Sequence, residues 1–138
     1  MSRFVLDASV ALAWFIDHPV APYAVEIKEE FERGSSGVVP FLWELEFANG
    51  ILVAERRKIV NRHEAEEALA KMERLRAAGV EMDSGIALVR DIVALAREFQ
   101  LTAYDASYVE LASREGLPLA TLDKKLRTAA VKAGIRIM

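Results

Sequence analysis

The chain has 138 residues, of which 53% are hydrophobic and 28% are charged. This balance is typical of one folded domain and excludes a disordered chain. Because there is no cysteine, disulfide bonds, thiolate zinc sites and a cysteine nucleophile are excluded as well. No apolar run reaches the roughly 18 residues of a membrane span, and the N-terminus lacks a signal-peptide pattern. We therefore expect a soluble, cytoplasmic protein without a membrane segment.

The net charge of −3 is unevenly distributed along the chain. Residues 114–138 carry six basic and two acidic side chains, a balance of +4, which leaves −7 for residues 1–113. An acidic chain does not favour nucleic acid as a partner, but a local basic patch can contact phosphates. The alternative is a helix face whose charges serve only solvation.

Short apolar runs alternate with helical segments from one end of the chain to the other. The first run, Phe4-Val5-Leu6, precedes a helix that ends before Pro19. Pro40 opens a later helix, and Asn61 and Glu64 have the spacing of a capping box. In chain order we expect strands over 4–6, 37–39, 80–82, 119–121 and 135–137. The expected helices cover 8–16, 22–33, 40–57, 61–77, 84–99, 103–114 and 124–132.

This alternation predicts one α/β domain over residues 1–138, with a parallel sheet covered by helices on both faces. Ligands of open α/β sheets bind beyond the carboxyl ends of the strands. Asp7 directly follows the first expected strand, and Asp123 lies two residues after the fourth. Both acids are therefore expected at the same edge of the sheet.

Each of the acids that follow apolar segments also has a structural explanation. Asp7 and Asp123 can be helix N-caps, and Asp105 can be the first-turn acid of a helix capped by Thr102. An acid in apolar surroundings is nevertheless costly to bury unless its charge is compensated, and a divalent cation would compensate several acids at once. Oxygen ligands favour magnesium or manganese.

The helix expected over 40–57 offers two further carboxylates. Residues 41–53 are apolar almost all round, which implies burial on most faces. At helical spacing Glu46 shares its stripe with Asn49, whereas Glu44 has only apolar neighbours. Periodicity alone does not choose between the two.

Four short motifs resemble those of PIN-domain ribonucleases, in the same order and at compatible spacing from residue 4 to about 137. They are Asp7-Ala8-Ser9 after an apolar strand, Pro40 followed by Glu46-Phe47-Ala48-Asn49, Tyr104-Asp105-Ala106-Ser107-Tyr108, and Leu119-Ala120-Thr121-Leu122-Asp123-Lys124-Lys125-Leu126. The length and the motifs most resemble VapC-type toxins of bacterial and archaeal toxin–antitoxin pairs. The resemblance implies a three-layer α/β/α domain around a mainly parallel sheet of roughly five strands.

The resemblance also implies the roles of individual residues. It assigns metal binding and catalysis to Asp7, Glu46, Asp105 and Asp123. It selects Glu46 over Glu44 because Asn49 follows three residues later, as in the family. Ser9, Asn49 and Thr121 are the expected auxiliary polar groups. Where some members carry a fifth acid, this chain has Lys124 and Lys125, so we expect one firmly bound magnesium ion.

A Mg²⁺-dependent endoribonuclease, with Mn²⁺ as a substitute metal, is the activity that the resemblance implies. It also implies a homodimer and a VapB-like antitoxin whose C-terminal segment covers the acidic pocket. We expect RNA backbone contacts from Arg56, Arg57, Lys124 and Lys125, the alternative being plain surface charge. The aromatic side chains of the early helices can form an interface or belong to the core; they are Trp14, Phe15, Tyr23 and Phe31.

Two other functions compete with this interpretation. An aspartate-nucleophile phosphohydrolase also places an Asp after its first strand, but that class usually has a second Asp two positions on, where this chain has Ser9. A PIN-like interaction domain without strong catalysis is the other alternative, and it would be favoured if one of the four acids were missing. None of them is missing.

Overall fold

A parallel β-sheet of four strands forms the centre of the protein, in a computed structural model that describes residues 2–138. The strand order is β3-β2-β1-β4, and every pairing is parallel. The strands are β1 (Arg3–Leu6), β2 (Ser36–Val39), β3 (Val80–Met82) and β4 (Leu119–Ala120). Parallel strands need crossover connections, and helices provide them here.

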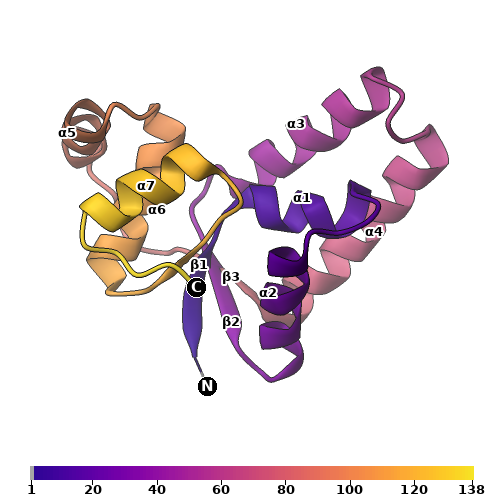
Figure 1. Cartoon of the computed structure of the whole chain (residues 1–138), viewed down its shortest axis with the longest axis horizontal. Helices are drawn as coiled ribbons and strands as arrows, with labels where there is room; N and C mark the ends of the chain where they lie inside the picture. The colour runs from indigo at the N-terminus through magenta and orange to yellow at the C-terminus, as the bar shows by residue number, and fades with distance from the viewer. Residues whose placement is uncertain (1) are drawn as a thin grey trace.

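Seven helices surround the sheet among the described residues, and Figure 1 shows how they divide. Helices α1 to α4 lie on one side of the strands and α5 to α7 on the other, which gives the expected three layers. The helices are α1 (Ala8–Ile16), α2 (Pro22–Glu32), α3 (Trp43–Arg56), α4 (Arg62–Gly79), α5 (Val89–Phe99), α6 (Ala103–Glu115) and α7 (Lys124–Lys132). In the described part of the chain, no helix has the length and apolar character needed to cross a membrane.

The central strand β1 brings distant parts of the chain to one edge of the sheet. Its side chains Phe4, Val5 and Leu6 are fully buried, because both faces of a doubly covered sheet are core. It pairs with β2 on one side and β4 on the other. The Asp7 amide donates to the Ala120 carbonyl at 3.0 Å, so the carboxyl ends of β1 and β4 lie side by side.

The aromatic residues of the early helices pack with one another rather than forming an outer surface. The Phe31 ring meets Phe4 and Trp14 edge to face, at centroid distances of 5.3 and 5.5 Å. Phe15 meets Phe47 in the same way at 5.8 Å, and the Trp14 indole donates to the Ala24 carbonyl at 2.6 Å. Edge-to-face pairs of this kind stabilise packing, and these three partly buried aromatics pack against the core, as the core alternative expects.

Two expected helix starts are wrong. The helix expected from Pro40 begins at Trp43, because a turn closed by the Trp43 amide and the Pro40 carbonyl comes first. The helix expected from Ser84 begins at Val89. Before it, the Asp83 carboxylate accepts from the Gly85 amide and pairs with Arg114 at 2.6 Å, so a side chain holds this segment as a loop.

The expected fifth strand is also wrong, since the sheet has four strands. Residues 135–137 contribute only one isolated parallel bridge, between Leu119 and Ile137. The Ile135 amide is still bonded to the Ala130 carbonyl, which terminates α7. The segment therefore meets the two-residue strand β4 at a single bridge and forms no strand of its own.

Candidate active site

Asp7 is held at the end of β1 by two hydroxyl groups. Ser9 Oγ and Thr121 Oγ1 both donate to Asp7 Oδ2, at 2.6 and 2.7 Å. Asp7 is only 6% exposed and Thr121 is fully buried. Asp7 stands at the N-cap position of α1 but makes no side-chain capping bond there. Its carboxylate is therefore turned toward the β4 loop, and the capping explanation fails for this residue.

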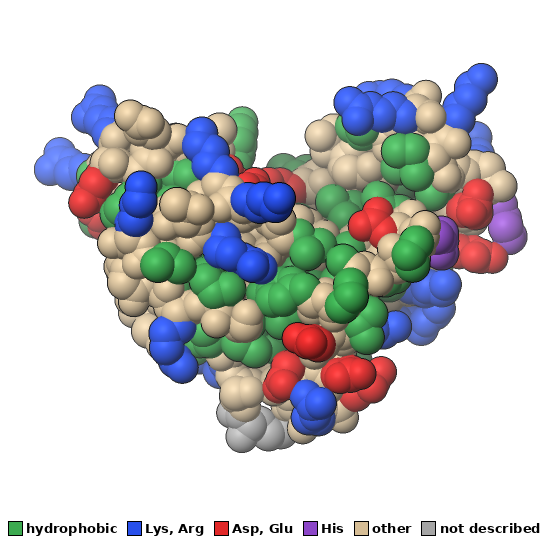
Figure 2. All heavy atoms as spheres, viewed as in Figure 1, with side chains coloured by type: hydrophobic (Ala, Val, Ile, Leu, Met, Phe, Trp, Pro, Cys, Tyr) green, Lys and Arg blue, Asp and Glu red, His purple; other side chains and the backbone are tan. Residues whose placement is uncertain are grey.

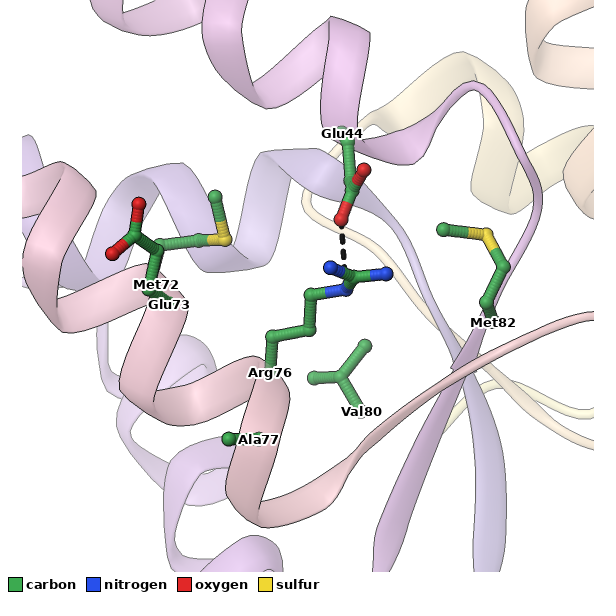
Figure 3. Close-up of a pocket in the computed structure, with 7 residues that line it drawn as sticks. All are labelled: Glu44, Met72, Glu73, Arg76, Ala77, Val80 and Met82. Carbon is green, nitrogen blue, oxygen red and sulfur yellow. Dashed lines mark ion pairs between the residues drawn. The ribbon is translucent and has the colours of Figure 1, made fainter.

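The two glutamates of α3, Glu44 and Glu46, have different partners. Tyr108 donates its hydroxyl hydrogen to Glu46 Oε1 at 2.5 Å, which ties Glu46 to α6. Glu44 instead forms an ion pair with Arg76 of α4 at 2.7 Å. Figure 3 shows this pair in a separate cavity that also includes Met72 and Met82. Glu46 therefore belongs with Asp7, and Glu44 stabilises the contact between α3 and α4.

The remaining two acids lie at the N-terminal ends of helices. Asp123 Oδ1 accepts from the Lys125 and Leu126 amides, at 2.9 and 3.1 Å, and so caps α7. Thr102 caps α6 by accepting from the Asp105 amide at 3.1 Å. Asp123 is therefore the N-cap of α7, and Asp105 is the first-turn acid of a helix capped by Thr102, as their structural explanations predict. For Asp123, capping engages only one of the two carboxylate oxygens.

The pKa values indicate that these acids share one electrostatic environment. Burial raises the pKa of Asp7, and the charge of Asp123 raises it further, against the bonds from Ser9 and Thr121. Burial likewise raises the pKa of Glu46, with contributions from the charges of Asp7 and Asp105.

The pKa of Asp105 depends on the same neighbouring acids. Burial raises its pKa, the charges of Asp123 and Asp7 add to the rise, and the Lys125 ammonium opposes it. The charges of Asp7, Asp105 and Asp123 each raise the pKa of another of the four predicted acids, and Glu46 responds to two of them, as expected if all four surround one site. In Figure 2 acidic and basic side chains meet beside the hollow between the two groups of helices.

The donor chemistry fits a small divalent cation. Over residues 2–138, no three His, Cys, Asp or Glu side chains are arranged closely enough to surround a metal together. Magnesium, however, needs only one or two direct carboxylates and keeps several waters. Buried carboxylates with raised pKa values supply those oxygens, and Asp7 and Glu46 also have fixed positions.

Three residues of the site were not predicted from the sequence. Tyr108 is fully buried and links Glu46 to the Ala8 amide, which donates to its hydroxyl at 3.4 Å. The Tyr23 hydroxyl accepts from the Thr121 amide at 3.3 Å. Arg127 donates to the Thr121 carbonyl at 2.8 Å and lies 4.8 Å from the centre of the Tyr23 ring. Of these three residues, only Tyr108 could have been linked to the site from the sequence, because it lies one helical turn after Asp105.

Other predicted residues lie on exposed surface. Asn49 is exposed on α3, one turn beyond Glu46. Arg56 and Arg57 are exposed at the far end of α3, whereas Lys124 and Lys125 are exposed at the start of α7, next to Asp123. The structure thus places the lysines near the acids and leaves the two arginines at the outer end of a helix.

Comparisons with known proteins agree with this arrangement. Residues 4–132 match the family model of the PIN domain. Ribonuclease VapC3 of Pyrobaculum aerophilum is 30% identical over 128 residues, which cover 90% of this chain and 92% of that protein. The chain therefore belongs to the PIN-domain family, and within it to the VapC type.

Solved structures support the fold independently. The crystal structure of PAE2754 from Pyrobaculum aerophilum matches with a TM-score of 0.68 at 21% identity, over 96% of each chain. FitAcB from Neisseria gonorrhoeae matches with a TM-score of 0.58 at 14% identity, over 98% of this chain and 96% of that one. At these identities the likeness concerns the fold alone.

Replacing Asp7 with asparagine is expected to stabilise the metal-free protein at neutral pH. Because the pKa of Asp7 is raised, the folded state binds more protons than the unfolded state, and wild-type stability falls as pH rises through that pKa. Asparagine carries no charge and can still accept from Ser9 and Thr121. We expect the free energy of unfolding at pH 7 to rise on the order of 1 kcal/mol.

Urea unfolding in EDTA, at pH 7 and at about pH 4.5, measures this effect. The advantage of Asp7→Asn should shrink at the lower pH, because protonation of the wild-type carboxyl group increases as the pH falls. A variant that is less stable than the wild type at pH 7 would contradict the raised pKa.

Proposed function

We propose that this protein is a Mg²⁺-dependent endoribonuclease of the VapC toxin type, which also accepts Mn²⁺. One observation carries the proposal: four acids from separate segments converge electrostatically beside the carboxyl end of β1. The 30% identity to a protein named Ribonuclease VapC3 supports RNA as the substrate. We further propose that the protein acts in the cytoplasm, where a VapB-like antitoxin neutralises it by covering the acidic pocket.

Asp7, Glu46, Asp105 and Asp123 are the proposed ligands and catalytic residues. Bound magnesium would polarise the phosphoryl group, lower the pKa of the attacking water and stabilise the leaving 3′ oxygen. Ser9 and Thr121 orient the Asp7 carboxylate, and Asn49 is the proposed auxiliary residue on α3. Phosphodiester hydrolysis then leaves a 5′-phosphate and a 3′-hydroxyl.

Proton transfer at this site falls to carboxylates. His63 pairs with Glu67 on α4 at 2.8 Å, and His18 is exposed in the loop after α1, so neither accompanies the four acids. A carboxylate whose pKa is raised is a better proton acceptor than an ordinary one. Asp7, Glu46 and Asp105 all meet that condition.

The alternatives have less support. A phosphohydrolase that uses Asp7 as its nucleophile usually has a second Asp two positions on, which acts as the acid. In this chain that position is Ser9, whose hydroxyl is bonded to Asp7 itself. A non-catalytic PIN-fold interaction domain has no need for several acids with raised pKa values, which destabilise the metal-free fold at neutral pH.

Basic residues on α7 are the proposed RNA contacts. Lys125 lines a groove with Thr128 and Lys132, which follow at helical spacing on the same face, opposite the end of α5. Lys125 also acts electrostatically on Asp105, so the groove opens next to the acids. Ammonium groups in this position suit phosphates of a strand that leaves the site.

An exposed apolar patch is the proposed interface with a second copy of the chain. Phe41, Leu45 and Leu52 point outward near and along α3 and are 81%, 67% and 45% exposed. Ile86, 85% exposed, lines the same cavity as Phe41, so the patch continues across the loop before α5. Large contiguous apolar patches mark association surfaces, and this patch replaces the early aromatics as the proposed homodimer interface.

Loss of a proposed ligand should abolish cleavage. We expect Asp7→Asn and Asp105→Asn each to lower the rate of RNA cleavage with Mg²⁺ more than about a hundredfold, because losing even an outer-shell partner typically costs ten- to a hundredfold. Glu44→Gln is the matched control and should cleave at the wild-type rate. Cleavage of total RNA and sequencing of the new ends measure both. Wild-type rates in both Asn variants would refute the proposed site.

Removal of the Lys125 charge should weaken RNA binding more than it affects the chemical step, which it reaches only through the pKa of Asp105. For Lys125→Ala we expect KM to rise severalfold with a smaller change in kcat, and the salt dependence of binding to decrease by about one ion. Lys71→Ala, which removes an exposed lysine of α4, is the control. An unchanged KM and salt slope would exclude Lys125 as a phosphate contact.

A charge placed in the apolar patch should separate the homodimer. We expect Leu45→Glu to sediment as a monomer at concentrations where the wild type is a dimer, because an ionised carboxylate is costly to bury. Val131→Glu replaces a similarly exposed apolar residue of α7 (59% exposed) and should remain dimeric. A monomeric wild type would refute the homodimer itself.

A further inference from the structure

Three of the four acids have one oxygen occupied by the protein itself. On Glu46 it is Oε1, bonded to Tyr108. On Asp7 it is Oδ2, which receives both hydroxyl bonds. On Asp123 it is Oδ1, bonded to two amides of α7. Within residues 2–138, the other oxygen of each of these three carboxylates accepts no side-chain hydrogen bond.

The occupied oxygens are tightly held. The Tyr108 side chain is fully buried, so water cannot easily replace its hydroxyl at Glu46. A hydrogen bond of 2.5 Å to a carboxylate lies at the short end of the charge-assisted range. The two bonds to Asp7 Oδ2 are nearly as short, at 2.6 and 2.7 Å. Each carboxylate thus offers one oxygen to a ligand.

This pattern favours one size of cation over another. Ca²⁺ takes six to eight oxygen ligands and often binds carboxylates through both oxygens, whereas Mg²⁺ needs few direct carboxylates in a strict octahedron. A hydrogen bond takes one of the two lone pairs of a carboxylate oxygen, so it makes metal binding through both oxygens less favourable than binding through the other oxygen alone. The hydrogen-bond donors around the site therefore act against calcium without touching the metal.

We propose that Tyr108 is a positioning residue that biases Glu46 toward single-oxygen binding and so increases the preference of the site for Mg²⁺ and Mn²⁺ over Ca²⁺. The inference rests on the proposed function, because it takes the four acids as the metal site. Tyr108 is well placed for this role, since its one hydroxyl contacts α3 through Glu46 and the start of α1 through the Ala8 amide. It thereby fixes the distance between two of the segments that carry the acids.

Tyr108→Phe tests the proposal, because it removes the donor and keeps the ring. Calorimetric titration of the full-length, metal-free protein with Mn²⁺ alone and with Ca²⁺ alone gives the two affinities. We expect the variant to bind Mn²⁺ about tenfold more weakly, the usual effect of an outer-shell loss. Its affinity for Ca²⁺ should stay level or increase, so that the preference for Mn²⁺ decreases about tenfold.

Tyr104→Phe is the matched control, since Tyr104 lies on the same helix and is 65% exposed. It should leave both affinities unchanged. If Tyr108→Phe does not fold, the double variant Ser9→Ala and Thr121→Val removes both donors from Asp7 Oδ2 and should shift the preference in the same direction. Equal changes for both metals, or none, would overturn the proposal and assign Tyr108 to packing alone.

The same measurements separate this proposal from the proposed function. A wild type that cleaves RNA and binds Mn²⁺, with an unchanged metal preference in Tyr108→Phe, overturns only the role of Tyr108. A wild type that binds Mn²⁺ with the expected preference but cleaves no RNA overturns the nuclease, and the role of Tyr108 is then still supported if Tyr108→Phe loses that preference. A wild type that binds neither metal overturns both.

Discussion

The structure depends on a buried carboxylate that joins the first strand to the last. Asp7 is almost inaccessible to water, and its negative charge is compensated by the hydroxyls of Ser9 and Thr121 instead of a basic side chain. Thr121 is itself held by Tyr23 and Arg127. Residues of two helices, α2 and α7, therefore help to hold Asp7 in place. Burial in this position raises the pKa of Asp7 and lowers the stability of the fold at neutral pH unless a cation is present.

At the other acids, capping and the proposed metal binding use the same side chains. Asp123 stabilises the start of α7 with one oxygen and leaves the second for chemistry. Asp105 occupies the first turn of α6, where the helix dipole favours a negative charge. The helix ends therefore offset part of the repulsion among the acids, and the local structure stabilises an arrangement that electrostatics alone would disfavour.

Much of the fold was readable from the sequence because its signals are local. The apolar run from Phe4 to Leu6 predicted a buried strand, and the bounds of α1, β3 and α7 agree with the prediction. The loop before α5 was missed because Arg114, far along the chain, fixes Asp83. The acids were visible at strand ends and in motifs, but the choice of Glu46 over Glu44 needed the resemblance. Tyr108 became visible as a partner of Glu46 only in three dimensions, since no local pattern relates the two.

The wide spacing of the acids has a consequence for synthesis of the protein. Asp7 directly follows the first strand, whereas Asp123 and the helix that it caps follow the last. A ribosome must therefore translate nearly the whole domain before the fourth acid exists, and β4 must pair with β1 before Thr121 can reach Asp7. A truncated product that ends before Asp123 cannot bring the four acids together, so the complete site exists only when translation has passed the last strand.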